Sequence, residues 1–156
     1  MVSVLGVNKL MADAGKHNQY FFVNRHELMM DAQGRIHIPR KWRPESGVET
    51  FFAQVKTDAV AGKYLRVFPM EEAIRMRNAQ NVEIEKNPAL ESRLRGVSGK
   101  MDSMDLDGAG RIALPEKMAA QAGIEKSSKV MVVGCFGFFE VWSEANHAKV
   151  PDADID

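Results

Sequence analysis

The sequence contains a single cysteine, Cys135, which excludes an intramolecular disulfide and is typical of a reducing compartment. It has no run of 18 or more apolar residues, so no membrane-spanning helix is predicted. The first residues lack the basic segment and the sustained apolar core of a signal peptide. We therefore expect a soluble cytoplasmic protein, in which Cys135 is a small packing residue rather than a reactive one.

The chain also lacks an excess of either charge, because 21 Lys and Arg balance 21 Asp and Glu. A nucleic-acid binder usually carries clustered cations, since phosphate contacts need them. The charges are, however, unevenly distributed along the chain. The window from Arg25 to Arg43 holds five basic and two acidic residues, whereas the window from Lys100 to Met118 holds three basic and four acidic residues. The first window is therefore the basic one.

Motifs of catalysis and metal binding are scarce. No histidine lies at a spacing from a carboxylate residue that is typical of a metal site. The four histidines are His17, His26, His37 and His147. No glycine-rich phosphate loop or nucleophile elbow occurs. The sequence therefore predicts a protein that is not an enzyme, with no metal, cofactor or small-molecule substrate.

One short phrase occurs twice, at residues 31–39 and 107–115, 76 positions apart. The copies read DAQGRIHIP and DGAGRIALP. In each copy Asp opens a tight turn, Gly provides a backbone conformation that other residues resist, and alternating apolar residues predict a short strand that Pro ends. Residues 40–43 and 116–120 follow, each long enough for one or two helical turns with Pro at the start.

Each phrase is followed by two apolar runs that a turn separates. These runs are 51–55 and 64–68 after the first copy, and 130–133 and 138–142 after the second. Because the order of elements is repeated, we interpret the chain as a tandem duplication. Each unit has only about 45 residues of strand-rich sequence, so the two must bury their apolar faces against each other.

The twin phrases D-x-x-G-R-[IV]-x-[IL]-P, each with a short helix and two strands after it, resemble the swapped-hairpin β-barrel of the SpoVT/AbrB type. Two such units, with Phe-Glu-Val-Trp-Ser at 139–143, are similar to the MraZ proteins, bacterial transcriptional regulators of the division and cell wall gene cluster. The resemblance implies an α+β fold, mainly β, in which two tandem SpoVT/AbrB-like units form a pseudo-two-fold swapped-hairpin β-barrel with short helices. It also implies a DNA-binding ring of several subunits.

We divide the chain into a flexible N-terminal lead at 1–19, a first SpoVT/AbrB-like repeat at 20–69, a helical insert at 70–99, a second repeat at 100–150 and an acidic tail at 151–156. The first strand is predicted to start at Tyr20. Within the insert, Pro69 and Asn87-Pro88 are typical of helix starts. Helical spacing predicts that Met70 and Ile74 face the core.

Arg35 and Arg111, the arginines of the two phrases, are the main candidates for a binding role. Two interpretations are open from the residues alone. Each arginine could simply brace its turn through Asp31 or Asp107. Alternatively, the carboxylate could hold the guanidinium in a fixed plane, ready for bidentate binding to a phosphate or to guanine. The resemblance to the MraZ family favours the second interpretation.

Three further residues complete the predicted DNA-binding set: Arg40 and Lys41 from the basic window, and His37 on the exposed side of its strand. Trp42 and Trp142 are expected in the core or an interface. Because Arg35 lies in the basic window and Arg111 does not, this reasoning predicts a larger loss of DNA binding from Arg35→Ala than from Arg111→Ala.

The resemblance thus implies double-stranded DNA as partner and a homo-oligomer, forming a ring, with no membrane association. The predicted function is that of a nucleoid-associated, sequence-specific transcriptional regulator acting on repeats upstream of the division and cell wall gene cluster, including its own gene. The alternative is an oligomeric interaction module or antitoxin-like protein of the same fold that does not bind DNA.

Overall fold

The computed structural model describes residues 20–151, so the predicted lead and all of the acidic tail but Pro151 lie outside the described residues. The strands are β1 (Arg25–Met29), β2 (Arg35–His37), β3 (Thr50–Asp58), β4 (Gly62–Pro69), β5 (Asp102–Asp105), β6 (Arg111–Ala113), β7 (Lys129–Gly134) and β8 (Phe139–Ser143). The helices are α2 (Met70–Lys86), α3 (Arg93–Val97), α4 (Glu116–Gln121) and α5 (Glu144–His147), with 3-10 turns η1 (Arg40–Trp42), η2 (Pro88–Ser92) and η3 (Ser98–Lys100). The predicted mixed fold, with most elements strands, is confirmed.

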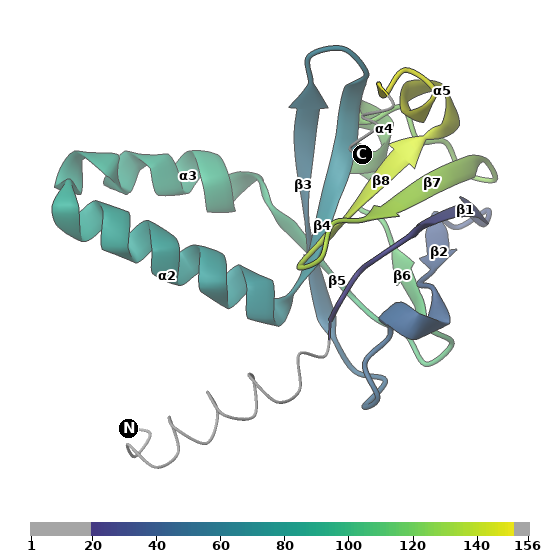
Figure 1. The fold of residues 1–156 in the computed structure, drawn as a ribbon, viewed down its shortest axis with the longest axis horizontal. Helices are drawn as coiled ribbons and strands as arrows, with labels where there is room; N and C mark the ends of the chain where they lie inside the picture. The colour runs from purple at the N-terminus through teal and green to yellow at the C-terminus, as the bar shows by residue number, and fades with distance from the viewer. Residues whose placement is uncertain (1–19, 152–156) are drawn as a thin grey trace, which may run out of the picture.

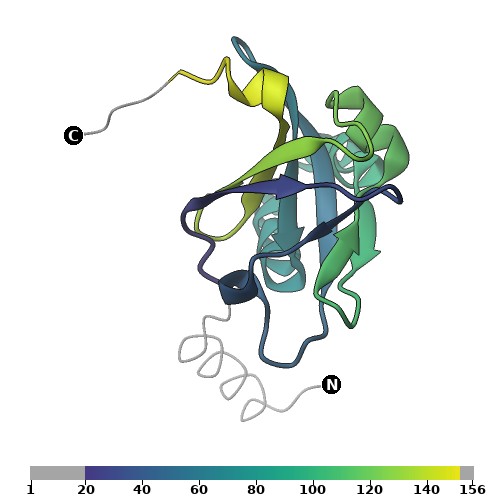
Figure 2. The same ribbon diagram turned by 90° about the vertical axis from the view of Figure 1, so that its right-hand side faces the viewer.

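The main sheet has six strands in the order β1-β7-β8-β4-β3-β5, and all its neighbours are antiparallel (Figure 1). Its order exchanges the first strands of the two repeats. Strand β1 of the first repeat pairs with β7 of the second, while β5 of the second repeat pairs with β3 of the first. Figure 2 shows β1 lying alongside the hairpin of the second repeat. Each repeat thus completes its sheet with a strand from the other.

Within residues 20–151 the sheet is open, because β1 and β5 each have a hydrogen-bonded neighbour on one side only. The predicted closed barrel is therefore not observed among the described residues. In its place, β2 and β6 form a separate two-stranded ribbon. Strand β2 follows β1, and β6 follows β5, each after a tight turn that opens with Asp. The turns lead the chain away from the main sheet, so the ribbon does not continue it.

The first strand begins later than the sequence predicts. It starts at Arg25 rather than Tyr20, because Asn24 adopts a left-handed backbone with a φ of 80° that interrupts an extended strand. Phe22 keeps one isolated bridge to Phe136. The ring of Phe22 is buried and packs edge-to-face on Trp42 at 5.4 Å between centroids. Trp42 and Trp142 are both buried, as predicted.

Helix α2 and the following η2 and α3 form an arm that projects from the sheet (Figure 1). The helix starts immediately after Pro69, and the Asn87 side chain accepts a hydrogen bond from the backbone of Ala89, so both predicted helix starts are confirmed. The prediction that Met70 and Ile74 face the core is wrong, since each is 41% exposed. The helix stands off the sheet, and helical spacing alone does not reveal what covers an apolar face. No helix within residues 20–151 has the length and apolarity needed to cross a membrane.

Candidate nucleic-acid interface

The ribbon brings the two copies of the repeated phrase together. In its antiparallel register, Ile36 lies opposite Ile112, and both side chains are buried. The ribbon is extended at both ends, where the Ile38 amide donates to the Gly110 carbonyl at 2.9 Å and the Leu114 amide donates to the Gly34 carbonyl at 3.0 Å. The two phrases, far apart in the sequence, therefore form one continuous surface element.

The outer face of the ribbon carries the charged side chains. Residues directly opposite each other on antiparallel strands project from the same face, and neighbours along a strand alternate. Since Ile36 points inward, Arg35 and His37 point outward, as do their partners Ala113 and Arg111. Cross-strand pairing places His37 directly beside Arg111, and Ala113 beside Arg35. The predicted residues Arg35, His37 and Arg111 thus share one exposed face.

The first turn holds Arg35 in a fixed orientation through Asp31. The Arg35 Nε donates to Asp31 Oδ2 at 2.7 Å, while the backbone amides of Gln33 and Arg35 both donate to Asp31 Oδ1 at 2.9 Å. These bonds, with the Arg35 amide as the largest contributor, hold the pKa of Asp31 at about 2. The carboxylate therefore stays ionised and keeps its hold on the guanidinium at physiological pH.

The second turn repeats this geometry. The Arg111 Nε donates to Asp107 Oδ2 at 2.9 Å, and the amides of Ala109 and Arg111 donate to Asp107 Oδ1 at 2.9 Å. The Arg111 amide is again the main reason that the pKa of Asp107 is lowered. The same local sequence thus produces the same local bonds in both copies.

The geometry accommodates both interpretations that the sequence left open. Each arginine braces its turn through Nε, while its terminal Nη atoms have no hydrogen-bond partner within residues 20–151. The Arg35 and Arg111 side chains are 31% and 27% exposed. Each guanidinium is therefore held on one edge and keeps its terminal nitrogens for another group.

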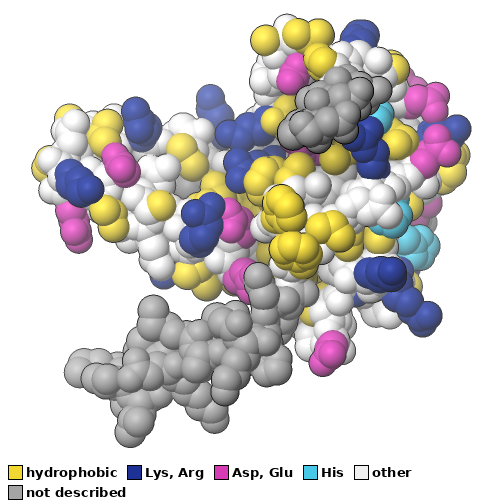
Figure 3. Space-filling model, in the orientation of Figure 1, with side chains coloured by type: hydrophobic (Ala, Val, Ile, Leu, Met, Phe, Trp, Pro, Cys, Tyr) yellow, Lys and Arg dark blue, Asp and Glu magenta, His cyan; other side chains and the backbone are white. Residues whose placement is uncertain are grey.

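The predicted residues Arg40 and Lys41 lie in η1, directly after Pro39, and both are exposed. Figure 3 shows Lys, Arg and His side chains close to one another on the part of the surface where η1 lies in Figure 1. Trp42, the last residue of η1, is buried and anchors this short element to the core. The two cations are thus presented at one end of the ribbon.

Arg43 is a residue that the sequence-based site left out. Its Nε donates to the Ile38 carbonyl at 2.8 Å, and its guanidinium lies against Gly110, where an added Cβ would come within 2.3 Å of Cζ. Although Arg43 belongs to the basic first window, it covers the turn of the second phrase. The linear sequence gives no signal for this contact, because it depends on the pairing of β2 with β6. Counting Arg43 in the basic window of Arg35 therefore assigns its charge to the wrong turn.

The first turn has different neighbours. The Cε of Lys126 is the nearest atom to the Cβ position of Gly34, at 3.8 Å, so the two are only in ordinary contact. Lys126 also pairs with Glu116, with 3.6 Å between Nζ and Oε1. A carboxylate therefore offsets the added cation near the first turn.

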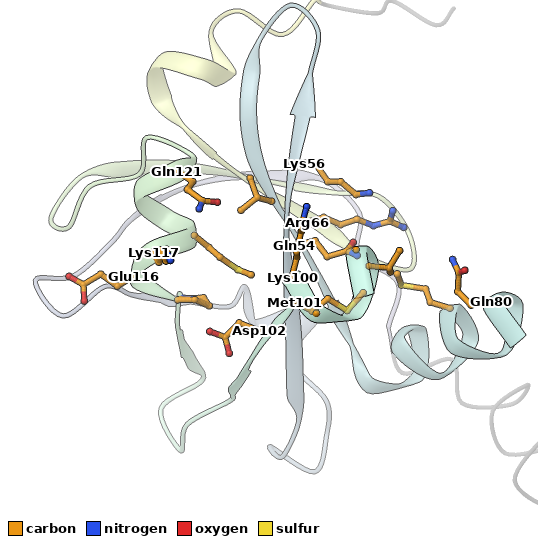
Figure 4. Close-up of a pocket in the computed structure, with 17 residues that line it drawn as sticks. Gln54, Lys56, Arg66, Gln80, Lys100, Met101, Asp102, Glu116, Lys117 and Gln121 are labelled. Atoms are coloured by element: carbon orange, nitrogen blue, oxygen red, sulfur yellow. The ribbon is translucent and has the colours of Figure 1, made fainter. Parts of the chain in front are cut away.

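A cavity of about 620 Å³ lies between the arm, strands β3 and β4, and α4 (Figure 4). Gln54 and Arg66, paired across β3 and β4, line it. The Arg66 guanidinium stacks on the Phe138 ring at 3.8 Å. Its lining includes no His, Cys, Ser, Thr or Tyr side chain. The polar groups of the cavity lining are instead Lys and Arg cations, Gln amides and the carboxylates of Asp102 and Glu116.

The described residues contain no group of three or more His, Cys, Asp or Glu arranged to hold a metal ion. Cys135 is half-buried, and burial is the main cause that raises the pKa of its thiol to about 11. The charged groups that the ribbon brings together are arginines, Arg35 and Arg111, each oriented by a carboxylate.

Comparison with known proteins adds to this geometry. A family model described as "MraZ protein, putative antitoxin-like" matches residues 99–154. A protein of Shewanella denitrificans named transcriptional regulator MraZ is 32% identical over 118 residues, which cover 76% of each chain. Proteins with the same name from Marinobacter nauticus and Saccharophagus degradans are also 32% identical, over 85% of this chain and 87% and 90% of theirs. These relatives are named as regulators, not enzymes, and the chain belongs to the MraZ family.

Proposed function

We propose that this protein is a sequence-specific DNA-binding transcriptional regulator that contacts DNA with the outer face of the β2–β6 ribbon. One observation carries the proposal. Two arginines on one exposed face are each oriented by a carboxylate through Nε, and within residues 20–151 no group accepts a hydrogen bond from their terminal nitrogens, so these can bind a further partner. A two-stranded β-ribbon is narrow enough to enter the major groove of B-DNA.

The residues of this face would divide the work. Arg35 and Arg111 would each present two terminal nitrogens to guanine O6 and N7, the pairing that best distinguishes guanine in the major groove. Arg40 and Lys41 would bind phosphates, which fix register without reading sequence. Asp31 and Asp107 would orient the arginines, and His37 would add a contact beside Arg111.

The regulator would act as the resemblance implies, on repeated sites upstream of the division and cell wall gene cluster and of its own gene, at the nucleoid. The exchange of first strands between the repeats supports a swapped-hairpin relationship of the SpoVT/AbrB type. Relatives named transcriptional regulator MraZ support the regulatory role.

We further propose that copies of the chain assemble into a ring. The arm exposes Met70, Ile74 and Val82, and Phe21 and Phe136 form an exposed pair of aromatic rings at 5.1 Å between centroids. Exposed apolar surface of this kind suits a contact between copies, and a head-to-tail contact closes into a ring when the rotation allows. Light scattering should give a mass of several subunits for the wild type and a lower mass for Ile74→Asp. A monomeric wild type at micromolar concentration would contradict the ring.

The proposed function is tested by titrating the protein with a duplex from upstream of its own gene and with a scrambled duplex. Arg35→Ala and Arg111→Ala should each weaken specific binding by about 1–3 kcal/mol per base contact, and by more in an oligomer that binds several sites at once. Lys63→Ala, which removes an exposed charge from β4, away from the ribbon and the arm, is the matched control and should bind like the wild type. Circular dichroism and mass must first show that each variant is folded and assembled.

The alternative, an oligomeric interaction module that does not bind DNA, has one observation in its favour: both arginines already have a structural partner in their own turn. The same titration separates the two functions. A DNA-binding protein must lose affinity steeply as salt rises, because phosphate contacts release counterions. A wild-type protein with no salt-dependent affinity for either duplex would refute the DNA-binding proposal.

A further inference from the structure

We infer that Arg43 is a phosphate-binding residue of the DNA-contacting face, and that the second turn is the more strongly cationic end of the ribbon. The inference rests on the proposed DNA-binding function and adds to it a residue that belongs to neither repeated phrase.

The backbone on both sides of Arg43 is anchored. Trp42 before it and Pro44 after it are buried, while Arg43 itself is half-buried. Its Nε donates to the Ile38 carbonyl at 2.8 Å. The side chain is therefore held in one place before any ligand arrives, which lowers the entropy lost on binding.

The guanidinium of Arg43 can lie flat on the second turn only because position 110 is glycine. An added Cβ would come within 2.3 Å of Cζ and 2.5 Å of Nη1. As with Arg111, the terminal nitrogens of Arg43 have no hydrogen-bond partner within residues 20–151. Two guanidinium groups with free terminal nitrogens therefore meet at the turn that contains Asp107, Gly110 and Arg111.

The immediate neighbours make the two ends of the ribbon unequal. At the second turn, Arg111 pairs with one carboxylate, Asp107, the Arg43 guanidinium lies against Gly110, and His37 lies beside Arg111. At the first turn, Arg35 and Lys126 are matched by two carboxylates, Asp31 and Glu116. In space, the second turn is therefore the more positively charged of the two, whereas the charges counted along the sequence predict that the first is.

A phosphate is the ligand that suits Arg43. With Nε committed to the Ile38 carbonyl and one face of the guanidinium covered by Gly110, the remaining donors are the terminal nitrogens at the ribbon end. Such an edge matches a phosphate oxygen pair next to a base that Arg111 reads. Arg43 should therefore add affinity that is independent of base sequence.

The test measures Kd for the specific and the scrambled duplex over a series of salt concentrations, with assembled full-length protein. Arg43→Gln keeps an N–H donor for the Ile38 carbonyl but removes the charge, whereas Arg43→Lys keeps the charge. We expect Arg43→Gln to make the slope of log K against log salt shallower by about 0.9 for each phosphate that the protein no longer neutralises, and to do so equally on both duplexes. Arg43→Lys should keep the wild-type slope. Lys63→Ala on β4 should also keep it.

The outcomes separate this inference from the proposed function. If the wild type binds with a salt-dependent Kd and Arg111→Ala weakens binding to the specific duplex, the proposed function stands. In that case, a wild-type slope for Arg43→Gln, or the same reduced slope for Gln and Lys, would overturn the phosphate contact. If the wild type shows no salt-dependent binding, the proposed function itself fails.

Discussion

Ile36 of the first repeated phrase lies directly opposite Ile112 of the second, and both side chains are buried beneath the β2–β6 ribbon. The inner face of the ribbon therefore belongs to the core, while its outer face carries Arg35 and Arg111. Because one pair of strands serves both faces, core packing also fixes the separation of the two arginines.

Removing the side chain of Ile36 should accordingly affect both stability and binding. Ile36→Ala leaves a cavity beneath the ribbon and should lower the free energy of unfolding by about 2–5 kcal/mol. Urea denaturation measures the loss. Met29→Ala, at a position 62% exposed on β1, is the control and should change stability by about 0.5 kcal/mol or less. An Ile36→Ala protein as stable as the control would contradict the buried pairing.

The two turn glycines form a matched pair. Gly34 and Gly110 have φ angles of 77° and 80°, so alanine at either position introduces strain of roughly 1–2 kcal/mol. At Gly110 the new Cβ must also displace the Arg43 guanidinium, whereas at Gly34 it meets only the flexible Lys126 at 3.8 Å. Gly110→Ala should therefore lower the melting temperature more than Gly34→Ala. Equal shifts would show that Arg43 moves aside without cost.

Acid should weaken the first turn over a defined range. The pKa of Asp31 is lowered in the folded protein from an ordinary 3.8 to about 2, so the ionised carboxylate stabilises the fold above the ordinary value. This contribution is lost as the pH falls through about 2. Asp31→Asn should thus be less stable than the wild type at neutral pH, with the difference shrinking below about pH 4. Urea denaturation at several pH values gives the comparison, and a constant difference would contradict it.

The thiol of Cys135 should react slowly in the folded protein. Burial, followed by the charge of Glu140, raises its pKa to about 11, so little thiolate is present near neutral pH. A thiol reagent such as DTNB should label it slowly until denaturant is added. Rapid stoichiometric labelling of the native protein would mean that the loop between β7 and β8 opens readily.

Much of this molecule could be predicted from local sequence. The Asp-to-Gly turns, the short strands at Ile36 and Ile112, and the helix starts at Pro69 and Asn87 all depend on residues a few positions apart. The two Asp–Arg pairs are of the same kind, since a carboxylate at the start of the turn is within reach of an arginine four residues later.

The features that the sequence did not reveal depend on contacts across the chain. Nothing in the linear order places Arg43 against Gly110, because that contact requires β2 to pair with β6. Helical spacing at Met70 and Ile74 indicates an apolar face, but the face is exposed because the arm projects from the sheet. The sheet is likewise open because β2 and β6 leave it after their turns and pair with each other instead.

The exchange of first strands also determines how the chain must fold. Arg25 pairs with Val133, so the first strand of the sheet finds its neighbour only after nearly all of the polypeptide is available. Contacts between such distant residues carry a loop-closure cost before they stabilise anything, which slows folding. Neither repeat cut out alone would keep its own edge strand paired, so separate halves should fold only by recombining with each other. We therefore expect the two similar halves of this chain to unfold as one cooperative unit.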